Sequence, residues 1–429
     1  MAVVTGESIA LGIFLTPATM ARSLGSPGLL AAVWCGMALM ALSGALCYSE
    51  LAVRFPRSGG EYVYLREGYG ERVAFLFGWM SAAVMDPGLA AALAVGAAGY
   101  AASIFALSPG QSALFPALLL LVLAGVNLLG TKLSGRVMTA VNVTKLLVLF
   151  ALVAWSFASG RGTAANLHPF WERKPGSEAL FGALASAVIN AFFSFGGWWE
   201  AGKLAGEIRD PRRNLPRAFT GGVLLVTAVY LLISFAFLYI VPLGQIASNT
   251  AFVAQFGSAL FGAAGGRVLS ACVLLSVVGG LAALTMAAPR VYSAMARDGS
   301  FFPAFGRMRT RFQSPVHGIV LQTGLALLLL TLGAFDRILA YIIFSAVVFL
   351  GLSAATLFRV RPAVQRWWFP VAPMIFLLGC FIVAALILMH DPLPALLGVA
   401  VVLAGDLLRR FYFPAGREDI TPAADSTIV

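Results

Sequence analysis

Charged residues are scarce in this chain, because Asp, Glu, Lys and Arg make up only 11% of its 429 residues. A soluble globular domain carries about 25% charged residues, so the composition excludes a soluble protein with one large core. Hydrophobic residues make up 60% of the chain, and apolar runs of about 20 residues recur along its length. The sequence therefore predicts an all-α integral membrane protein.

Cysteine and histidine are also rare. The four cysteines, Cys35, Cys47, Cys272 and Cys380, fall inside apolar runs, which favours small buried thiols over disulfides or a metal cluster. The three histidines have no metal-ligand neighbours, so we expect no metal site. Phosphate-binding glycine loops, nucleophile elbows and HExxH motifs are missing. We therefore expect neither an enzyme nor a cofactor.

Acidic residues are outnumbered, since 18 Asp and Glu face 29 Lys and Arg, which gives a net charge of +11. In a membrane protein such an excess marks cytoplasmic loops rather than a nucleic-acid surface. With the N-terminus inside, most of the Lys and Arg fall on the inner side. The outer exceptions are Arg22, Arg161, Arg173, Lys174, Arg267 and Arg337. This asymmetry predicts a multi-pass protein of the cell inner (plasma) membrane with both termini cytoplasmic and no nucleic-acid partner.

Hydropathy predicts twelve membrane-spanning helices. Their approximate ranges are 2–21, 28–53, 72–104, 113–132, 136–159, 179–205, 217–241, 266–296, 315–333, 337–359, 369–389 and 393–413. We expect a single transporter domain over residues 1–413. The polar segment 414–429 is expected to be a disordered cytoplasmic tail.

The sixth predicted span contains an interruption, Ser194-Phe195-Gly196-Gly197-Trp198. Two adjacent glycines lower helix propensity by about 1 kcal/mol each relative to alanine. Backbone groups that lose their partners in lipid cost several kcal/mol unless they line a cavity or meet a ligand. A broken helix here therefore predicts a binding site. The alternative is that the glycines only allow close helix packing.

The first predicted span carries a matching interruption five helices earlier. Gly6, Glu7 and Gly12 precede the pair Thr16-Pro17. Paired breaks in the first and sixth helices are typical of inverted-repeat transporters. We therefore expect a 5+5 inverted repeat over residues 1–159 and 179–359, with the last two helices appended over 369–413.

Two predicted cytoplasmic loops carry more than charge. The segment RFPRSGGEYVYLREGYG between spans 2 and 3 predicts a short helix in the membrane interface, with its tyrosines at headgroup depth. The segment EIRDPRRNLPRA after span 6 predicts a structured turn, and Lys203 is assigned to this loop. For both segments the alternative is a basic surface patch for anionic lipid.

Three separate segments resemble a known family. SFGGWWEAGKLAGEIRDPRRNLPRA resembles the sixth-helix signature of amino acid permeases in the amino acid–polyamine–organocation superfamily. LSGALCYSELAVRFPRSGGEYVYLREGYG is similar to the family's helix 2 and first loop, and VYSAMARDGSFFPAFGRM to its helix 8 and following loop. The resemblance covers nearly the whole chain and is nearest to bacterial relatives of the L-amino acid transporters. It implies a LeuT-type fold with broken helices 1 and 6.

The resemblance also implies a substrate site at the two breaks, where free N–H groups meet the carboxylate of an amino acid and free carbonyls meet its ammonium. By position, the N–H donors are those of Leu11 and Gly12. The implied carbonyl acceptors and aromatic walls, with the glycine of the second break, are Ser8, Ile9, Phe193, Gly196 and Trp198. The chain departs from the family at Ala10-Leu11-Gly12, where the usual pattern is Gly-Ser-Gly, so a serine hydroxyl is missing.

Lys145 lies deep in the fifth span, where a lone cation is expensive in lipid and functional by default. The family has a lysine here, thought to replace the sodium ion of related transporters. One interpretation makes Lys145 a proton carrier, and a second makes it a structural cation that ties helices 1, 5 and 8 together. A third has it snorkel to the interface. Ser276 and Thr285 are candidate hydroxyl partners.

Three of the acidic residues inside the predicted spans are candidates for a role in the site. Asp86 either contacts the substrate or pairs with Lys145 or a backbone donor. Glu7 is a second candidate partner of Lys145. Glu200 either faces the cavity or caps the second half of helix 6, where a carboxylate suits the positive end of the helix dipole.

Taken together, these features predict a secondary transporter that moves L-amino acids by alternating access, without sodium, by proton symport or exchange. An exchanger of cationic amino acids or polyamines is the alternative if Asp86 and Glu200 line the cavity. A transporter-like amino acid sensor is a third hypothesis. The expected partners are an amino acid, the lipid bilayer and, in a symporter, protons. The predicted outer loop IFALSPGQS has no cysteine, so we expect no disulfide-linked glycoprotein partner.

Overall fold

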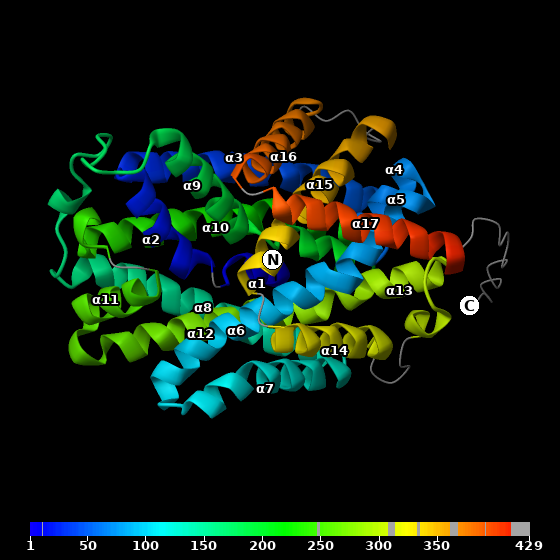
Figure 1. The fold of residues 1–429 in the computed structure, drawn as a ribbon, viewed down its shortest axis with the longest axis horizontal. Helices are drawn as coiled ribbons and strands as arrows, with labels where there is room; N and C mark the ends of the chain where they lie inside the picture. Colours follow the sequence, from blue (N-terminus) through cyan, green and yellow to red (C-terminus); the bar gives the residue numbers. More distant parts are fainter. Residues whose placement is uncertain are drawn as a thin grey trace.

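The structure is a computed structural model in which all regular secondary structure of the described residues is helical. Most of the long helices run side by side along the long axis of the molecule (Figure 1). This arrangement agrees with the predicted all-α membrane protein. The described residues are 1–10, 12–246, 249–307, 314–332, 335–360, 368–390 and 392–412.

Within these residues, nine helical segments are long and apolar enough to cross a membrane. They coincide with predicted spans 2 to 8, 10 and 11. The segments are Pro27–Arg54, Glu71–Phe105, Pro109–Leu128, Gly135–Ala158, Leu180–Glu207, Pro211–Ile240, Gln255–Arg297, Ile342–Val360 and Val371–Met389.

The three other predicted spans are also helical but fall short of that criterion. The first is broken into two pieces, and the ninth is the helix α14, Val316–Leu332. The twelfth is α17, Leu393–Tyr412, which carries Asp406 and two arginines in its second half. The total of twelve spans therefore stays a prediction.

Both predicted breaks are present. The first span consists of α1, Ala2–Ser8, and α2, Gly12–Leu24. In the sixth span, α9 (Leu180–Phe195) ends at Gly196, and the 3₁₀-helix η3 (Trp198–Glu207) follows. Gly197 has φ +95°, a left-handed conformation that glycine adopts without steric cost. The halves pack in matching pairs, since α2 contacts α9 and α1 contacts η3.

The remaining long helices surround these broken ones. α10 packs on α3, α12 packs on α6, and α8 contacts both α1 and α12. α5, η1 and α6 form one continuous rod, in which η1 is a π-helical turn directly before Asp86. The bounds are Pro27–Arg54 (α3), Glu71–Met80 (α5), Ser81–Met85 (η1), Asp86–Phe105 (α6), Pro109–Leu128 (α7), Thr131–Ala158 (α8), Pro211–Ile240 (α10), Gly265–Ala287 (α12), Pro289–Arg297 (α13), Phe335–Val360 (α15) and Val371–His390 (α16).

Three sequence predictions need correction or addition. The short helix after span 2 is present as α4, Glu61–Tyr69, but Tyr62 and Tyr64 are fully buried rather than at headgroup depth. The reason is that α4 packs against α5 and α15. Helix α11, Asn249–Phe261, was not predicted. All four cysteines are free thiols, but Cys35 is exposed, in contrast to the expected burial.

Candidate functional site

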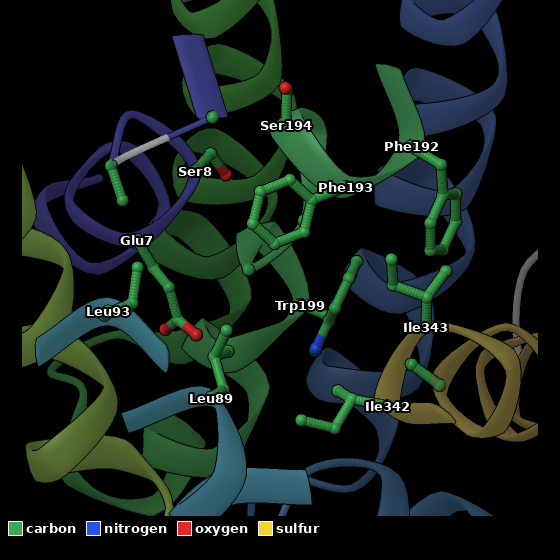
Figure 2. A pocket seen from close by; sticks show the side chains of 15 residues that line it. Glu7, Ser8, Leu89, Leu93, Phe192, Phe193, Ser194, Trp199, Ile342 and Ile343 are labelled. Atoms are coloured by element: carbon green, nitrogen blue, oxygen red, sulfur yellow. The ribbon is translucent and has the colours of Figure 1, made fainter. Parts of the chain in front are cut away.

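A cavity lies between the two breaks. Its empty volume is about 590 Å³, with its open side included. Figure 2 shows the break residues facing side chains of α6 and α15 across it. The lining residues from the breaks include Glu7, Ser8, Gly12, Phe193, Gly196, Gly197 and Trp199, and those from the other helices include Leu89, Leu93, Ile342 and Ile343.

The cavity combines apolar walls with polar backbone. Leucine, isoleucine and aromatic side chains cover most of its surface, and Glu7 and Ser8 are polar residues of its lining. Figure 2 shows the Glu7 carboxyl pointing toward Leu89 and Leu93. A mostly apolar pocket with a few polar groups suits a small organic ligand with a polar head.

The predicted tryptophan of the cavity wall differs from the observed one by a single residue. Phe193 lines the cavity as expected, but the tryptophan that joins it is Trp199. Trp198 is buried against the rings of Tyr48 and Phe376, with centroids 5.1 and 5.9 Å away. Because a 3₁₀-helix has three residues per turn, successive side chains point about 120° apart, and the two tryptophans face different sides.

The two breaks are held together by side chains that the sequence did not single out. The hydroxyl of Tyr230, from α10, donates to the carbonyl of Ser8 and lies 2.5 Å from the carbonyl of Ser194. The hydroxyls of Thr16 and Ser194 are 2.7 Å apart. A Cβ at Gly12 would lie 2.7 Å from the Ser194 hydroxyl, so this crossing requires glycine. A tyrosine in the middle of a mostly apolar span was the available signal.

Lys145 binds the end of the first half-helix. Its ammonium donates to the carbonyls of Thr5, Gly6 and Ile9 at 3.2, 3.0 and 2.7 Å. The Thr5 carbonyl also accepts the backbone N–H of Ile9 at 3.1 Å, whereas carbonyls at the end of a helix generally lack an intrahelical donor. A cation there suits the negative end of the helix dipole. These hydrogen bonds tie the fifth span to the first, which favours the hypothesis that Lys145 is a structural cation. They also mean that the Ile9 carbonyl, expected to face the substrate ammonium, is already occupied.

The residues expected to bind Lys145 do not contact it in the described hydrogen bonds. Thr285 accepts a hydrogen bond from Asn127 at 3.0 Å. The hydroxyl of Ser276 is buried with no partner. Glu7 lines the cavity instead of forming an ion pair with Lys145 among the described contacts.

Asp86 and Glu200 meet a third residue instead. The ammonium of Lys203 lies 3.2 Å from Asp86 Oδ1 and 2.7 Å from Glu200 Oε1. Lys203 is only 2% exposed, so its assignment to a cytoplasmic loop is wrong. The η3 helix keeps it inside the protein, where the two carboxylates compensate its charge. Neither Asp86 nor Glu200 is among the residues that line the cavity.

The structure thus brings together Glu7, Ser8, Gly12, Phe193 and Gly196 of the predicted site residues at one cavity. It places Ile9, Asp86, Lys145, Trp198 and Ser276 behind the cavity wall. Leu11 lies outside the described residues. No group of three or more metal-ligating side chains occurs in the described part of the chain.

Comparison with known proteins identifies the family of this chain. The profile of the amino acid permease family matches residues 1–401. The serine/threonine exchanger SteT of Bacillus subtilis is 29% identical over 94% of this chain and 93% of its own length. The human b(0,+)-type amino acid transporter 1 is 26% identical over 96% of this chain and 86% of its own.

The human large neutral amino acids transporter small subunit 2 is 27% identical over 94% of this chain and 77% of its own length. These relatives are transporters and not enzymes. The match to the family profile extends over both breaks and the cavity between them. The chain belongs to the amino acid permease family.

Proposed function

We propose that this protein is a secondary transporter that moves L-amino acids across the plasma membrane by alternating access, independently of sodium. The observation that carries the proposal is the cavity between two broken helices, lined by their free ends. Such ends supply backbone binding groups for a zwitterion.

The two ends of the amino acid would meet different groups. The substrate carboxylate would accept hydrogen bonds from N–H groups at the start of α2, near Gly12, where the helix dipole is positive. Leu11 would supply a further N–H. The substrate ammonium would donate to carbonyls at the end of α9, near Phe193 and Ser194. Ser8 and Ser194 share the single Tyr230 hydroxyl proton, so acceptor capacity remains for a ligand.

Sodium independence has its own support. The three α1 carbonyls that meet Lys145 form an oxygen-lined site for a cation, and the ammonium fills it. A sodium ion at this place would compete with a covalently attached cation. The relatives' names, an exchanger among them, favour exchange of one amino acid for another.

The apolar walls favour a neutral side chain on the substrate. The hypothesis of a cationic substrate depended on Asp86 and Glu200 in the cavity, and both instead pair with Lys203. The sensor hypothesis depended on the altered Ala10-Leu11 pair. Ala10 is buried at the cavity, and its small side chain leaves the space between the breaks open.

Architecture and orientation form part of the same proposal. We infer twelve spans in one domain over residues 1–413, a LeuT-type 5+5 inverted repeat and cytoplasmic termini. The matching contacts of α2 with α9 and of α1 with η3 support the repeat, because equivalent halves of an inverted repeat pack as pairs.

Exchange in proteoliposomes tests the function. Uptake of a labelled L-amino acid panel would be measured with and without internal amino acid, in sodium and in choline buffer. We expect uptake that internal amino acid stimulates and that ignores sodium. Phe193→Ala should reduce it at least ten-fold, whereas Phe181→Ala, on the same helix but 64% exposed, should not. Binding without flux would favour the sensor hypothesis. If the protein neither binds nor transports any amino acid, the proposal is overturned.

A further inference from the structure

Four carboxyl groups from four helical segments are buried inside the protein, and one of them lines the substrate cavity. They are Glu7 of α1, Glu61 of α4, Asp86 of α6 and Glu200 of η3, which are 6%, 1%, 4% and 3% exposed. Each of them acts electrostatically on the others. In the part of the chain that the structure describes, Lys203 is the ammonium that forms ion pairs with Asp86 and Glu200 and acts electrostatically on Glu7 and Glu61.

Lys203 and Asp86 form the fixed part of this cluster. Lys203 lies within 3.2 Å of Asp86 and 2.7 Å of Glu200. The second oxygen of Asp86 accepts from the hydroxyls of Ser81 and Tyr292, the latter at 3.1 Å. Asp86 is therefore well satisfied as a carboxylate, and Lys203 is held as an ammonium.

The other three carboxyl groups are incompletely satisfied. Glu7, Glu61 and Glu200 each have one buried oxygen, Oε2, without a hydrogen-bond partner. Full ionisation of four carboxyl groups beside one ammonium would bury an excess of three negative charges. Unpaired buried charges cost several kcal/mol each, and neighbouring carboxylates disfavour each other's ionisation. The cluster must therefore hold protons and titrate as a unit.

These groups connect two places in the molecule. Glu7 lines the cavity and lies against Gly197, where a Cβ would come within 2.5 Å of its side chain. Glu61 starts α4, and the preceding Gly60 lies against the Lys203 side chain. α4 lies at the end of the bundle that also carries α5 and α13 (Figure 1). The carboxyl groups thus lead from the cavity toward that end.

We propose that Glu7, Glu200 and Glu61, arranged around the Asp86–Lys203 pair, form a proton relay, and that the transporter moves a proton together with its amino acid. This inference rests on the proposed function, because it couples the relay to the same substrate cavity. A proton binds the Glu7 carboxylate from the cavity, passes to the Glu200 carboxylate, and leaves from Glu61. Each transfer protonates one carboxylate and regenerates another, and Lys203 stays charged.

The remaining groups that face the cluster do not neutralise it. Tyr48 of α3, Tyr64 of α4 and Tyr292 of α13 carry phenols, which are neutral at physiological pH. The ammonium of Lys145, from α8, donates its hydrogen bonds to backbone carbonyls of the first span. Burial raises the pKa of Glu61, outside the membrane-spanning helices, to about 8. The exit group therefore loads and releases a proton near neutral pH.

The test uses the full protein in proteoliposomes that enclose a pH-sensitive dye, with the L-amino acid that gives the largest uptake. We expect amino-acid-dependent acidification of the lumen and stimulation of uptake by an inward proton gradient. Glu200→Gln, which does not alter the cavity lining, should lower proton flux at least ten-fold while counterflow without a gradient persists. Glu7→Gln should lower proton flux at least as much. Glu50→Gln, which alters a buried carboxyl group outside the cluster, should leave proton flux unchanged.

Several results would overturn the relay. One is wild-type counterflow that moves no protons, which would leave the transporter proposal intact. Another is a Glu7→Gln variant that loses only transport of lysine or arginine, which would make Glu7 a contact for a cationic side chain. If no amino acid is transported, infrared spectra of the purified protein decide the question. A protonated-carboxyl band at neutral pH that weakens in Glu7→Gln supports the relay, and lack of that band overturns it.

Discussion

Gly197 illustrates how one residue sets the geometry of the site. Its φ of +95° and its contact with Glu7 leave no room for a side chain. An alanine there costs about 1–2 kcal/mol in backbone strain and meets the Glu7 side chain at 2.5 Å. We expect Gly197→Ala to lower the melting temperature and reduce uptake at least ten-fold.

Gly182 provides the matched control for that substitution. It lies on α9 with open space around its Cβ position. Alanine has a higher helix propensity by about 1 kcal/mol, so Gly182→Ala should retain stability and uptake. Equal behaviour of the two alanine variants would contradict the role assigned to Gly197.

The single side chain of Glu61 makes the free energy of unfolding depend on pH. Burial is the main cause that raises its pKa from 4.5 to about 8. The folded protein therefore binds this proton more tightly than the unfolded chain does. Stability is fully present below about 4.5 and falls as pH rises toward about 8, by at most about 1.4 kcal/mol per pH unit. Thermal melts of detergent-solubilised Glu61→Gln should show a flatter pH dependence between pH 5 and pH 8 than wild type.

At the scale of elements, Tyr230 connects the two broken helices through their carbonyls. Tyr230→Phe removes the shared hydroxyl and leaves buried carbonyls unpaired, which costs about 1–3 kcal/mol. We expect a lower melting temperature and weaker exchange. Tyr64→Phe is the control, because the Tyr64 hydroxyl is equally buried but has no partner. If the two variants lose the same stability, the link between the breaks contributes nothing.

The elements also show how far the sequence could predict this site. The breaks followed from glycine chemistry at Gly12, Gly196 and Gly197, which is local and therefore visible in sequence. The side that each tryptophan faces was not visible, because it depends on how η3 is rotated about its axis after the break. The Lys203–Asp86 pair joins residues 117 positions apart. Hydropathy and the count of basic residues see only a charge near the end of a span, and the count assigned Lys203 to the following loop.

At the scale of the whole molecule, the uneven distribution of Lys and Arg predicts which end faces the cytoplasm. The segment 160–178 and the α4–α5 corner lie at opposite ends of the bundle (Figure 1). The first belongs to the side poor in basic residues, and the second follows the arginine-rich segment after α3. Because basic loops stay on the cytoplasmic side, the two ends should differ in access to reagents outside the cell.

Single cysteines in a chain whose four native cysteines are replaced by serine test this orientation. Trp171 is 64% exposed in the 160–178 segment, and the Glu71 side chain is 53% exposed at the start of α5. We expect a membrane-impermeant maleimide to label Trp171→Cys in intact cells, but Glu71→Cys only after permeabilisation. The opposite pattern would invert the protein in the membrane, and the proposed relay would then lead from the cavity to the outside. Labelling of both sites in intact cells would mean that the two segments share one side, which a bundle spanning the membrane along its long axis does not permit.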